Sequence, residues 1–156
     1  MLPTLPRTPS LRLDGRRALG TGAGRGLGRA CSAALCEAGD RAHALVLDVT
    51  DSAAASSANR SIDCSTKHAL EGTSKALALG PHGIRVNTVC PTIIDTPMTH
   101  HWLAAPAFRD QMPGKIALGR VDRMEDVMGA VLFLAVDAAA LVTGSALMVD
   151  GGRTAA

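Results

Sequence analysis

Apolar residues recur at helical spacing in three parts of the chain. The clearest pattern covers 126–135, where apolar side chains three and four residues apart form one face and acidic residues stand in the first turn. The segments 27–38 and 67–79 show the same period, until Gly39 interrupts the first and the Gly-Pro-His-Gly sequence at 80–83 interrupts the second. The pattern predicts helices over these three segments.

Short apolar runs between these segments predict strands. They cover 17–19, 44–49, 84–90 and 146–149. The segment 91–119 has four prolines and little periodicity, so it is predicted to be a long loop that contains at most a short helix. Strands that alternate with helices predict an α/β domain with a mainly parallel sheet.

Length and composition indicate one globular domain. The chain has 156 residues, of which 47% are apolar and 19% charged, which suffices for a single core. The first residues are polar and punctuated by proline, so 1–14 are predicted to be an N-terminal tail and 15–156 a single domain. Within that domain, 52–61 are small and polar and predict little regular structure, and 95–118 are predicted to form a lid.

Charge and cysteine usage argue against several kinds of partner. The net charge is +2 with no basic stripe, so we expect no nucleic-acid partner. No apolar run reaches 18 residues and the first residues do not resemble a signal peptide, so we expect a cytoplasmic protein without a membrane partner. The four cysteines lack a Cys-x-x-Cys pair, so we expect reduced thiols and no metal site.

A glycine-rich sequence, Thr21-Gly-Ala-Gly-Arg-Gly-Leu-Gly28, lies between a predicted strand and a predicted helix. Glycines there let the backbone approach an anionic group, and the start of the helix presents free N–H donors to it. The sequence lacks the Gly-Lys-Ser/Thr ending of a P-loop, which disfavours a nucleoside triphosphatase. Taken alone, this turn predicts either a phosphate site or a tight strand-to-helix connection.

Seven motifs, taken in order, resemble the short-chain dehydrogenase/reductase family over nearly all of 15–152. They are Thr21-Gly-x3-Gly-x-Gly28, Leu47-Asp-Val-Thr50, Ser65-Thr-Lys-His-Ala-Leu-Glu-Gly72, Ile84-Arg-Val-Asn-Thr-Val-Cys-Pro91, Asp95-Thr-Pro-Met98, Gly119-Arg120 with Glu125-Asp-Val127, and Val142-Thr-Gly-Ser145 with Val149-Asp-Gly-Gly152. The resemblance implies a Rossmann-like, doubly wound parallel sheet and an oxidoreductase that uses NAD or NADP on a small alcohol or carbonyl substrate. It also implies a homo-dimer or homo-tetramer that associates through the helix at 66–79 and the last strand.

The same resemblance assigns site residues, each by its matching position. The set implied to bind the cofactor is Thr21, Gly22, Arg25, Gly26, Leu27, Gly28, Asp48, Lys67, Pro91, Ile94 and Thr96. The glycines of this set would form the pyrophosphate turn, Asp48 would lie beside the adenine, and Arg25 would meet a 2′-phosphate or remain a surface residue. Lys67 is the implied catalytic residue and would hold the nicotinamide ribose. Backbone at 91–94 and the Thr96 hydroxyl would hold the carboxamide.

Two features depart from the family pattern. The family has a proton-donating Tyr four residues before the Lys, and here that position is Asp63. A carboxyl beside Lys67 is ionised at neutral pH and has no proton to donate, so it could at most accept one or form an ion pair along the helix. The chain is also short: 15–156 supplies 142 residues, whereas seven strand–helix units need about 210.

The shortfall lies between Gly39 and Asp63, so the central strands of the sheet are predicted to be missing and the domain truncated. The strand with the family's catalytic Ser also falls there, and Ser57 is either its remnant or an ordinary loop serine. These departures leave two further hypotheses open. One is a catalytically inactive homologue with a nucleotide-binding or oligomerisation role, and the other is a non-functional fragment.

Overall fold

The computed structural model describes residues 8–20, 22–39, 60–79 and 82–155. In chain order its elements are α1 (Gly26–Ala38), α2 (Arg60–Ala78), β1 (Thr88–Pro91), α3 (His100–Leu103), α4 (Pro106–Gln111), the 3-10 turn η1 (Pro113–Lys115), α5 (Met124–Ala135), the 3-10 turn η2 (Asp137–Ala139) and β2 (Ala146–Val149). In the described part of the chain, no helix is long and apolar enough to cross a membrane.

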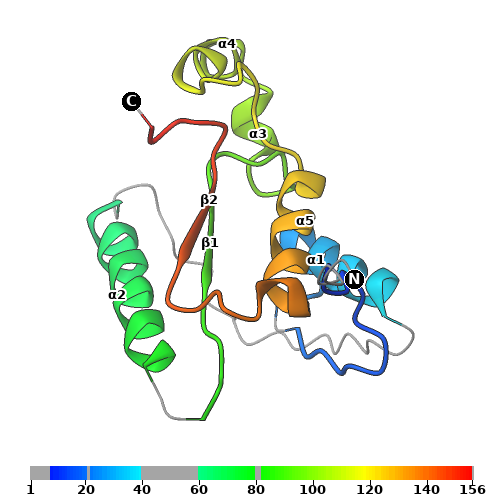
Figure 1. Cartoon of the computed structure of the whole chain (residues 1–156). Helices are drawn as coiled ribbons and strands as arrows, with labels where there is room; N and C mark the ends of the chain where they lie inside the picture. Colours follow the sequence, from blue (N-terminus) through cyan, green and yellow to red (C-terminus); the bar gives the residue numbers. More distant parts are fainter. Residues whose placement is uncertain (1–7, 21, 40–59, 80–81, 156) are drawn as a thin grey trace, which may run out of the picture.

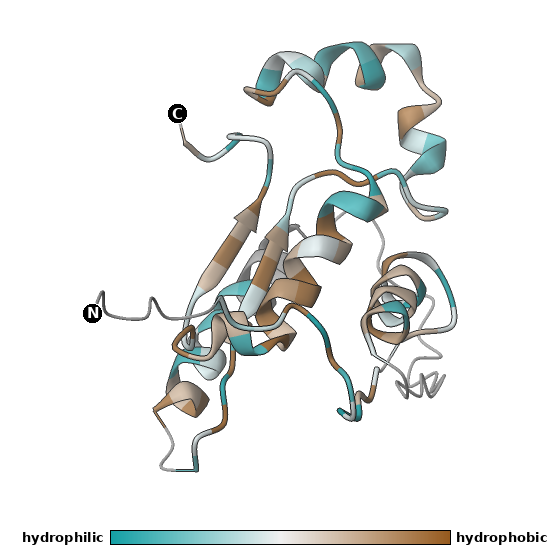
Figure 2. Cartoon of the chain, turned by 45° about the vertical axis from the view of Figure 1, so that its right-hand side comes forward, coloured by the Kyte–Doolittle hydropathy of each residue, from teal (hydrophilic) through white to brown (hydrophobic). Residues whose placement is uncertain are grey.

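Two parallel strands form the centre of the described structure. β1 pairs with β2 in a register that sets Thr88 opposite Ala146 and Pro91 opposite Val149. α2 lies on one side of this pair, and α5 with α1 lies on the other (Figures 1 and 2). The short helices α3 and α4 lie beyond the carboxyl ends of the strands (Figure 1). Helices on both sides of a parallel pair are the arrangement of a doubly wound α/β fold.

The best-packed part of the molecule lies where α1 meets α5. Val127 and Val136 are only 2% and 1% exposed. Leu13, Ala38 and Val136 form a buried cluster, and the Leu13 N–H donates to the Ala38 carbonyl oxygen at 2.8 Å. Figure 2 shows that apolar residues are concentrated along both strands and on α5. Leu13 therefore packs into the core although it belongs to the predicted N-terminal tail.

Helix prediction was accurate for α1 and α5 and less so for α2. The predicted helix at 27–38 is α1, and the one at 126–135 is α5, which begins two residues earlier. At the start of α5, the Asp126 carboxylate accepts the N–H of Arg123 at 2.8 Å. α2 begins at Arg60, so the prediction of little regular structure is wrong for its last two residues, 60 and 61.

Strand prediction succeeded only where a partner strand is present. The segment 146–149 is β2, but 17–19 is not a strand, because a short apolar run needs a neighbour to form a ladder and the described sheet has two strands only. The predicted strand at 84–90 begins later and ends one residue later, as Thr88–Pro91. Before it, the Val86 N–H donates to the Thr143 hydroxyl and the Asn87 side chain bonds Val142 and Ser145, so side chains replace part of the ladder there. The prediction at 44–49 lies outside the described residues.

The predicted loop at 91–119 contains more helix than expected. α3, α4 and η1 all lie within it, each of six residues or fewer. Proline opens α4 and η1 in the first helical turn, where its missing N–H costs nothing. Helices this short lack room for a periodic apolar pattern, and the prolines around them favour a loop prediction. The sequence therefore did not predict them.

Candidate functional site

The glycine turn before α1 depends on backbone conformations and close approaches that favour glycine. Gly22 and Gly26 have φ angles of +66° and +54°, which favour glycine. A Cβ added to either would meet no described residue within 4 Å. A Cβ on Gly28 would instead lie 2.2 Å from the Gly22 carbonyl oxygen, so glycine is required for the turn to close. Residue 21, the other predicted member of this turn, lies outside the described residues.

The start of α1 has no side-chain cap among the described residues. Arg25 occupies the N-cap position, and its side chain makes no capping hydrogen bond. The first backbone N–H groups of a helix have no partner within the helix and carry a partial positive charge. Arg25 is exposed and Leu27 is half-buried. This end of the 13-residue helix therefore combines open glycine backbone with N–H donors and a nearby guanidinium, which fits a phosphate group.

A second group of predicted residues lies at the carboxyl end of β1. Pro91 is the last residue of the strand, and Ile94 is 6% exposed. Ile94 forms a parallel bridge with Asp122, in which Asp122 N–H donates to Ile93 at 3.0 Å and Asp95 N–H donates to Asp122 at 3.1 Å. The segment 91–95 is thus held on both sides, by β2 and by 121–122.

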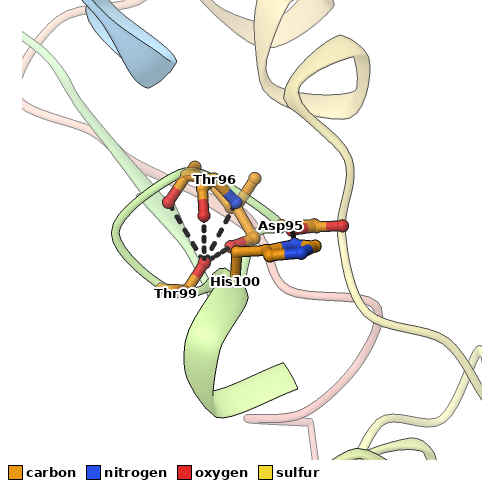
Figure 3. A network of polar contacts seen from close by, with 5 residues as sticks. Asp95, Thr96, Thr99 and His100 are labelled. Atoms are coloured by element: carbon orange, nitrogen blue, oxygen red, sulfur yellow. Dashed lines mark hydrogen bonds and ion pairs between the residues drawn. The ribbon is translucent and has the colours of Figure 1, made fainter. Parts of the chain in front are cut away.

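The Thr96 hydroxyl belongs to a local network centred on Thr99 (Figure 3). The Thr96 N–H donates to Thr99 Oγ1 at 3.0 Å, and the two hydroxyl oxygens lie 3.1 Å apart. Thr99 Oγ1 donates to the carbonyl oxygen of Ile94, and the Thr96 carbonyl oxygen lies 3.3 Å away. Beside the network, His100 Nδ1 lies 3.3 Å from Asp95 Oδ1. The residue predicted to hold a carboxamide is therefore fixed by a neighbour.

Two buried carboxyl groups lie where β1, β2 and the segment 119–123 converge. Asp122 is 5% exposed, and burial raises the pKa of its carboxyl, whose Oδ2 has no hydrogen-bond partner among the described residues. Asp150 is 9% exposed, but the Thr154 hydroxyl and the Gly152 N–H lower its pKa by donating to it. Near them, Arg153 Nη1 donates to Thr92 Oγ1 at 3.0 Å.

Lys67 lies apart from the glycine turn. It is exposed on α2, across the strand pair from α1 (Figure 1). Asp63 stands four residues earlier in the same helix, and Asp48 lies outside the described residues. A ligand that contacts both the turn and Lys67 must cross the carboxyl ends of the strands, which is where open α/β sheets bind ligands. The segment 91–96 lies at these ends.

Sequence reasoning missed Thr99, Asp122 and Arg153. Thr99 follows Thr96 by three residues, a spacing at which hydroxyl groups bond local backbone, so that signal was present. Asp122 and Arg153 owe their places to contacts with residues far along the chain, which no local pattern shows. The described residues contain no group of three or more His, Cys, Asp or Glu side chains arranged to hold a metal ion.

Comparison with known proteins gives both a family and a fold. The family model described as enoyl-(acyl carrier protein) reductase matches residues 25–154. D-erythrulose reductase of Gallus gallus is 46% identical, and L-xylulose reductase of Homo sapiens 45%, each over 96 residues. Each match covers 60% of this chain and 39% of the relative, so this chain spans about two-fifths of the length of these curated relatives.

Solved structures show the same fold at low identity. A gluconate 5-dehydrogenase from Burkholderia cenocepacia J2315, in complex with NADP and tartrate, has a TM-score of 0.80 and 22% identity over 94% of this chain and 98% of its own. A C-terminal deletion mutant of Thermoplasma acidophilum aldohexose dehydrogenase has a TM-score of 0.76 and 20% identity over 94% and 99%. Since the family model matches most of the chain and these folds agree, this protein is a member of the short-chain dehydrogenase/reductase family, with a truncated Rossmann-like fold.

Proposed function

We propose that this chain binds NAD or NADP and serves as an NAD(P)-dependent oxidoreductase acting on an alcohol or carbonyl group. The observation that carries the proposal is the glycine turn at the start of α1, where a Cβ on Gly22 or Gly26 would meet no described residue within 4 Å. A pyrophosphate would accept hydrogen bonds from the N–H groups there and be favoured by the helix dipole. The single domain predicted at 15–156, to whose core Leu13 also belongs, its lid at 95–118 and a cytoplasmic location are part of the proposal.

The proposed binding mode divides the dinucleotide between three parts of the chain. The turn holds the pyrophosphate, with Arg25 exposed beside it for a 2′-phosphate. The backbone of 91–94 and the Thr96 hydroxyl hold the carboxamide, and Lys67 holds the ribose from the other side of the strands. When bound, the nicotinamide supplies hydride-transfer chemistry. The bound NADP in the Burkholderia dehydrogenase supports testing NADPH before NADH.

Proton donation is the part of the reaction that these residues do not support. Asp63 stands where the family has its Tyr, and a carboxyl with an ordinary pKa near 4 is ionised at neutral pH. Next to Lys67 on the same helix it can accept a proton but does not donate one. This substitution favours a second candidate function, a homologue that binds nucleotide without catalysing the reaction.

Association into a homo-dimer or homo-tetramer is proposed for either function. Leu70 and Leu77 on α2 are 55% and 60% exposed, and Met148 on β2 is 51% exposed. Exposed apolar side chains on the helix and strand that the resemblance assigns to association support this proposal. Sedimentation of the purified chain tests it: a monomer at micromolar concentration would contradict it.

The Asp63→Tyr variant separates the two candidate functions. We expect the original chain to bind NADPH or NADH saturably by calorimetry, and the variant to gain reduction of D-erythrulose or L-xylulose, the compounds in the relatives' names. Binding without any gain would support the nucleotide-binding homologue. No binding by a cooperatively folded chain would contradict both, and a broad, uncooperative melt would indicate a fragment.

A further inference from the structure

The hydroxyl group of Thr99 lies among four polar atoms, and its hydrogen-bonding capacity limits what each can do (Figure 3). Its oxygen meets the Thr96 N–H at 3.0 Å and the Thr96 hydroxyl at 3.1 Å. It also meets two carbonyl oxygens, that of Ile94 at hydrogen-bond distance and that of Thr96 at 3.3 Å. A threonine hydroxyl has one proton to donate and two lone pairs that accept.

The two carbonyl oxygens decide where the Thr99 proton goes. Carbonyl oxygens only accept, so the proton of Thr99 must point toward one of them, and Ile94 is the nearer. One lone pair of Thr99 accepts the Thr96 N–H. The remaining lone pair faces the Thr96 hydroxyl, which must then be the donor in that contact. The opposite polarity would leave the Ile94 oxygen and the Thr99 oxygen facing each other without a proton.

We propose that Thr99 orients the Thr96 hydroxyl so that its oxygen accepts a hydrogen bond from the ligand. The site then prefers a ligand whose carboxamide presents its NH2 group to Thr96. Thr96 gives its only proton to Thr99, so its free lone pairs are what it offers to a bound group. Thr96 and Thr99 are both half-buried. A ligand group that cannot hydrogen-bond to the Thr96 hydroxyl therefore costs binding free energy that water does not fully restore. Thr99 is thus a positioning residue that acts through Thr96. This inference rests on the proposed binding of a nicotinamide dinucleotide.

The selectivity follows from the chemistry of the group at the 3-position of the pyridine ring. A carboxamide offers an N–H to an acceptor, whereas a carboxylate offers only lone pairs and a methyl ketone offers a methyl group in place of the amino group. An acceptor hydroxyl therefore matches the amide and mismatches both alternatives. A hydroxyl free to turn would donate to a carboxylate and lose this discrimination.

The test compares dissociation constants by calorimetry for NADP, its 3-acetylpyridine analogue and nicotinic acid adenine dinucleotide phosphate. We expect the original chain to bind NADP more tightly than either analogue. In Thr99→Val the preference for NADP over the carboxylate analogue should shrink about three- to tenfold, the factor for one hydrogen bond. Thr99→Ser keeps the hydroxyl and should keep the original preference. ADP-ribose, which lacks the pyridine ring, should bind all three proteins alike.

Each result has a distinct meaning. Equal binding of NADP and the carboxylate analogue by the original chain would overturn the inference, even if Thr99→Val does not fold. An unchanged preference in a folded Thr99→Val that still binds ADP-ribose would overturn it as well. If the original chain binds none of the dinucleotides, the proposed function itself fails, which differs from binding without selectivity.

Discussion

The two sides of the strand pair are packed very differently. On the side of α5 and α1, Val127 is 2% exposed, and α1 packs closely along α5. On the other side, Ser74 is the single buried residue among the described side chains of α2, while Leu70 and Leu77 are more than half exposed. Figure 1 shows α2 beside the strands on the side away from α5, where Cys90 Sγ of β1 lies 3.6 Å from Glu71 Oε1 of α2.

This difference separates the two halves of the proposed site. The glycine turn belongs to the well-packed side, so its backbone is held by the core and can present a fixed arrangement of N–H groups. Lys67 belongs to the other side, where its side chain is exposed. We therefore expect the absence of the family's Tyr at position 63 to affect the proposed catalytic half more than the proposed nucleotide-binding half.

The strongest test of this contrast substitutes one glycine on each side. Gly28→Ala places a Cβ 2.2 Å from the Gly22 carbonyl oxygen, and we expect it to destabilise the chain by about 3 kcal/mol and to abolish dinucleotide binding. The Cβ of Gly72→Ala in α2 meets no described residue within 4 Å, so this substitution should stabilise the chain by about 0.5 to 1 kcal/mol. Urea unfolding measures both. Equal effects of the two substitutions would contradict the contrast.

Truncating one apolar side chain on each side gives the next largest effect. Val127→Ala removes buried methyl groups, and we expect a loss of about 2 kcal/mol in the free energy of unfolding. Leu77→Ala removes a larger group, but one that is 60% exposed, so the change should stay within about 0.5 kcal/mol. Thermal unfolding of both variants decides the matter. If Leu77→Ala lowers the free energy of unfolding by more than Val127→Ala at micromolar concentration, the exposed face of α2 is instead buried in solution, for example against a second copy of the chain.

The smallest effect concerns pH and the buried Asp122. Burial raises its pKa above the ordinary value of 3.8, so the folded chain holds this proton more tightly than the unfolded chain does. The carboxyl therefore lowers stability as the pH rises above 3.8, and the full loss is present above the folded-state pKa. Asp122→Asn should accordingly raise Tm at pH 7 and bring little gain at pH 4.

Asp126 provides a control of opposite sign. Hydrogen bonds from the Arg120 guanidinium and the Arg123 N–H hold its pKa far below the usual range, so its contribution to stability is present at neutral pH and declines as the pH falls below 3.8. Asp126→Asn should lower Tm at pH 7, and that deficit should shrink in acid. If both variants shift Tm in the same direction at pH 7, the assignment of the Asp122 effect to burial is wrong.

Local sequence pattern predicted the elements that carry their own signal. The apolar period found α5, and the run at 146–149 found β2, because each buries a continuous apolar face. The segment 17–19 has a similar run but no partner strand in the described structure, and strand formation depends on that partner. Residues 91–96 could be assigned only by resemblance, and their immobilisation by Asp122 depends on a bridge between segments 28 positions apart.

The most direct test of the nucleotide-binding claim is the map of amide chemical shifts on titration with NADPH. We expect the resonances of Gly22, Gly26 and Thr96 to move saturably with one common Kd, because the turn and the strand ends contact the same ligand. Amides at the far end of α2, 75–79, should stay in place. A folded chain whose glycine-turn amides do not move with NADPH would contradict the account.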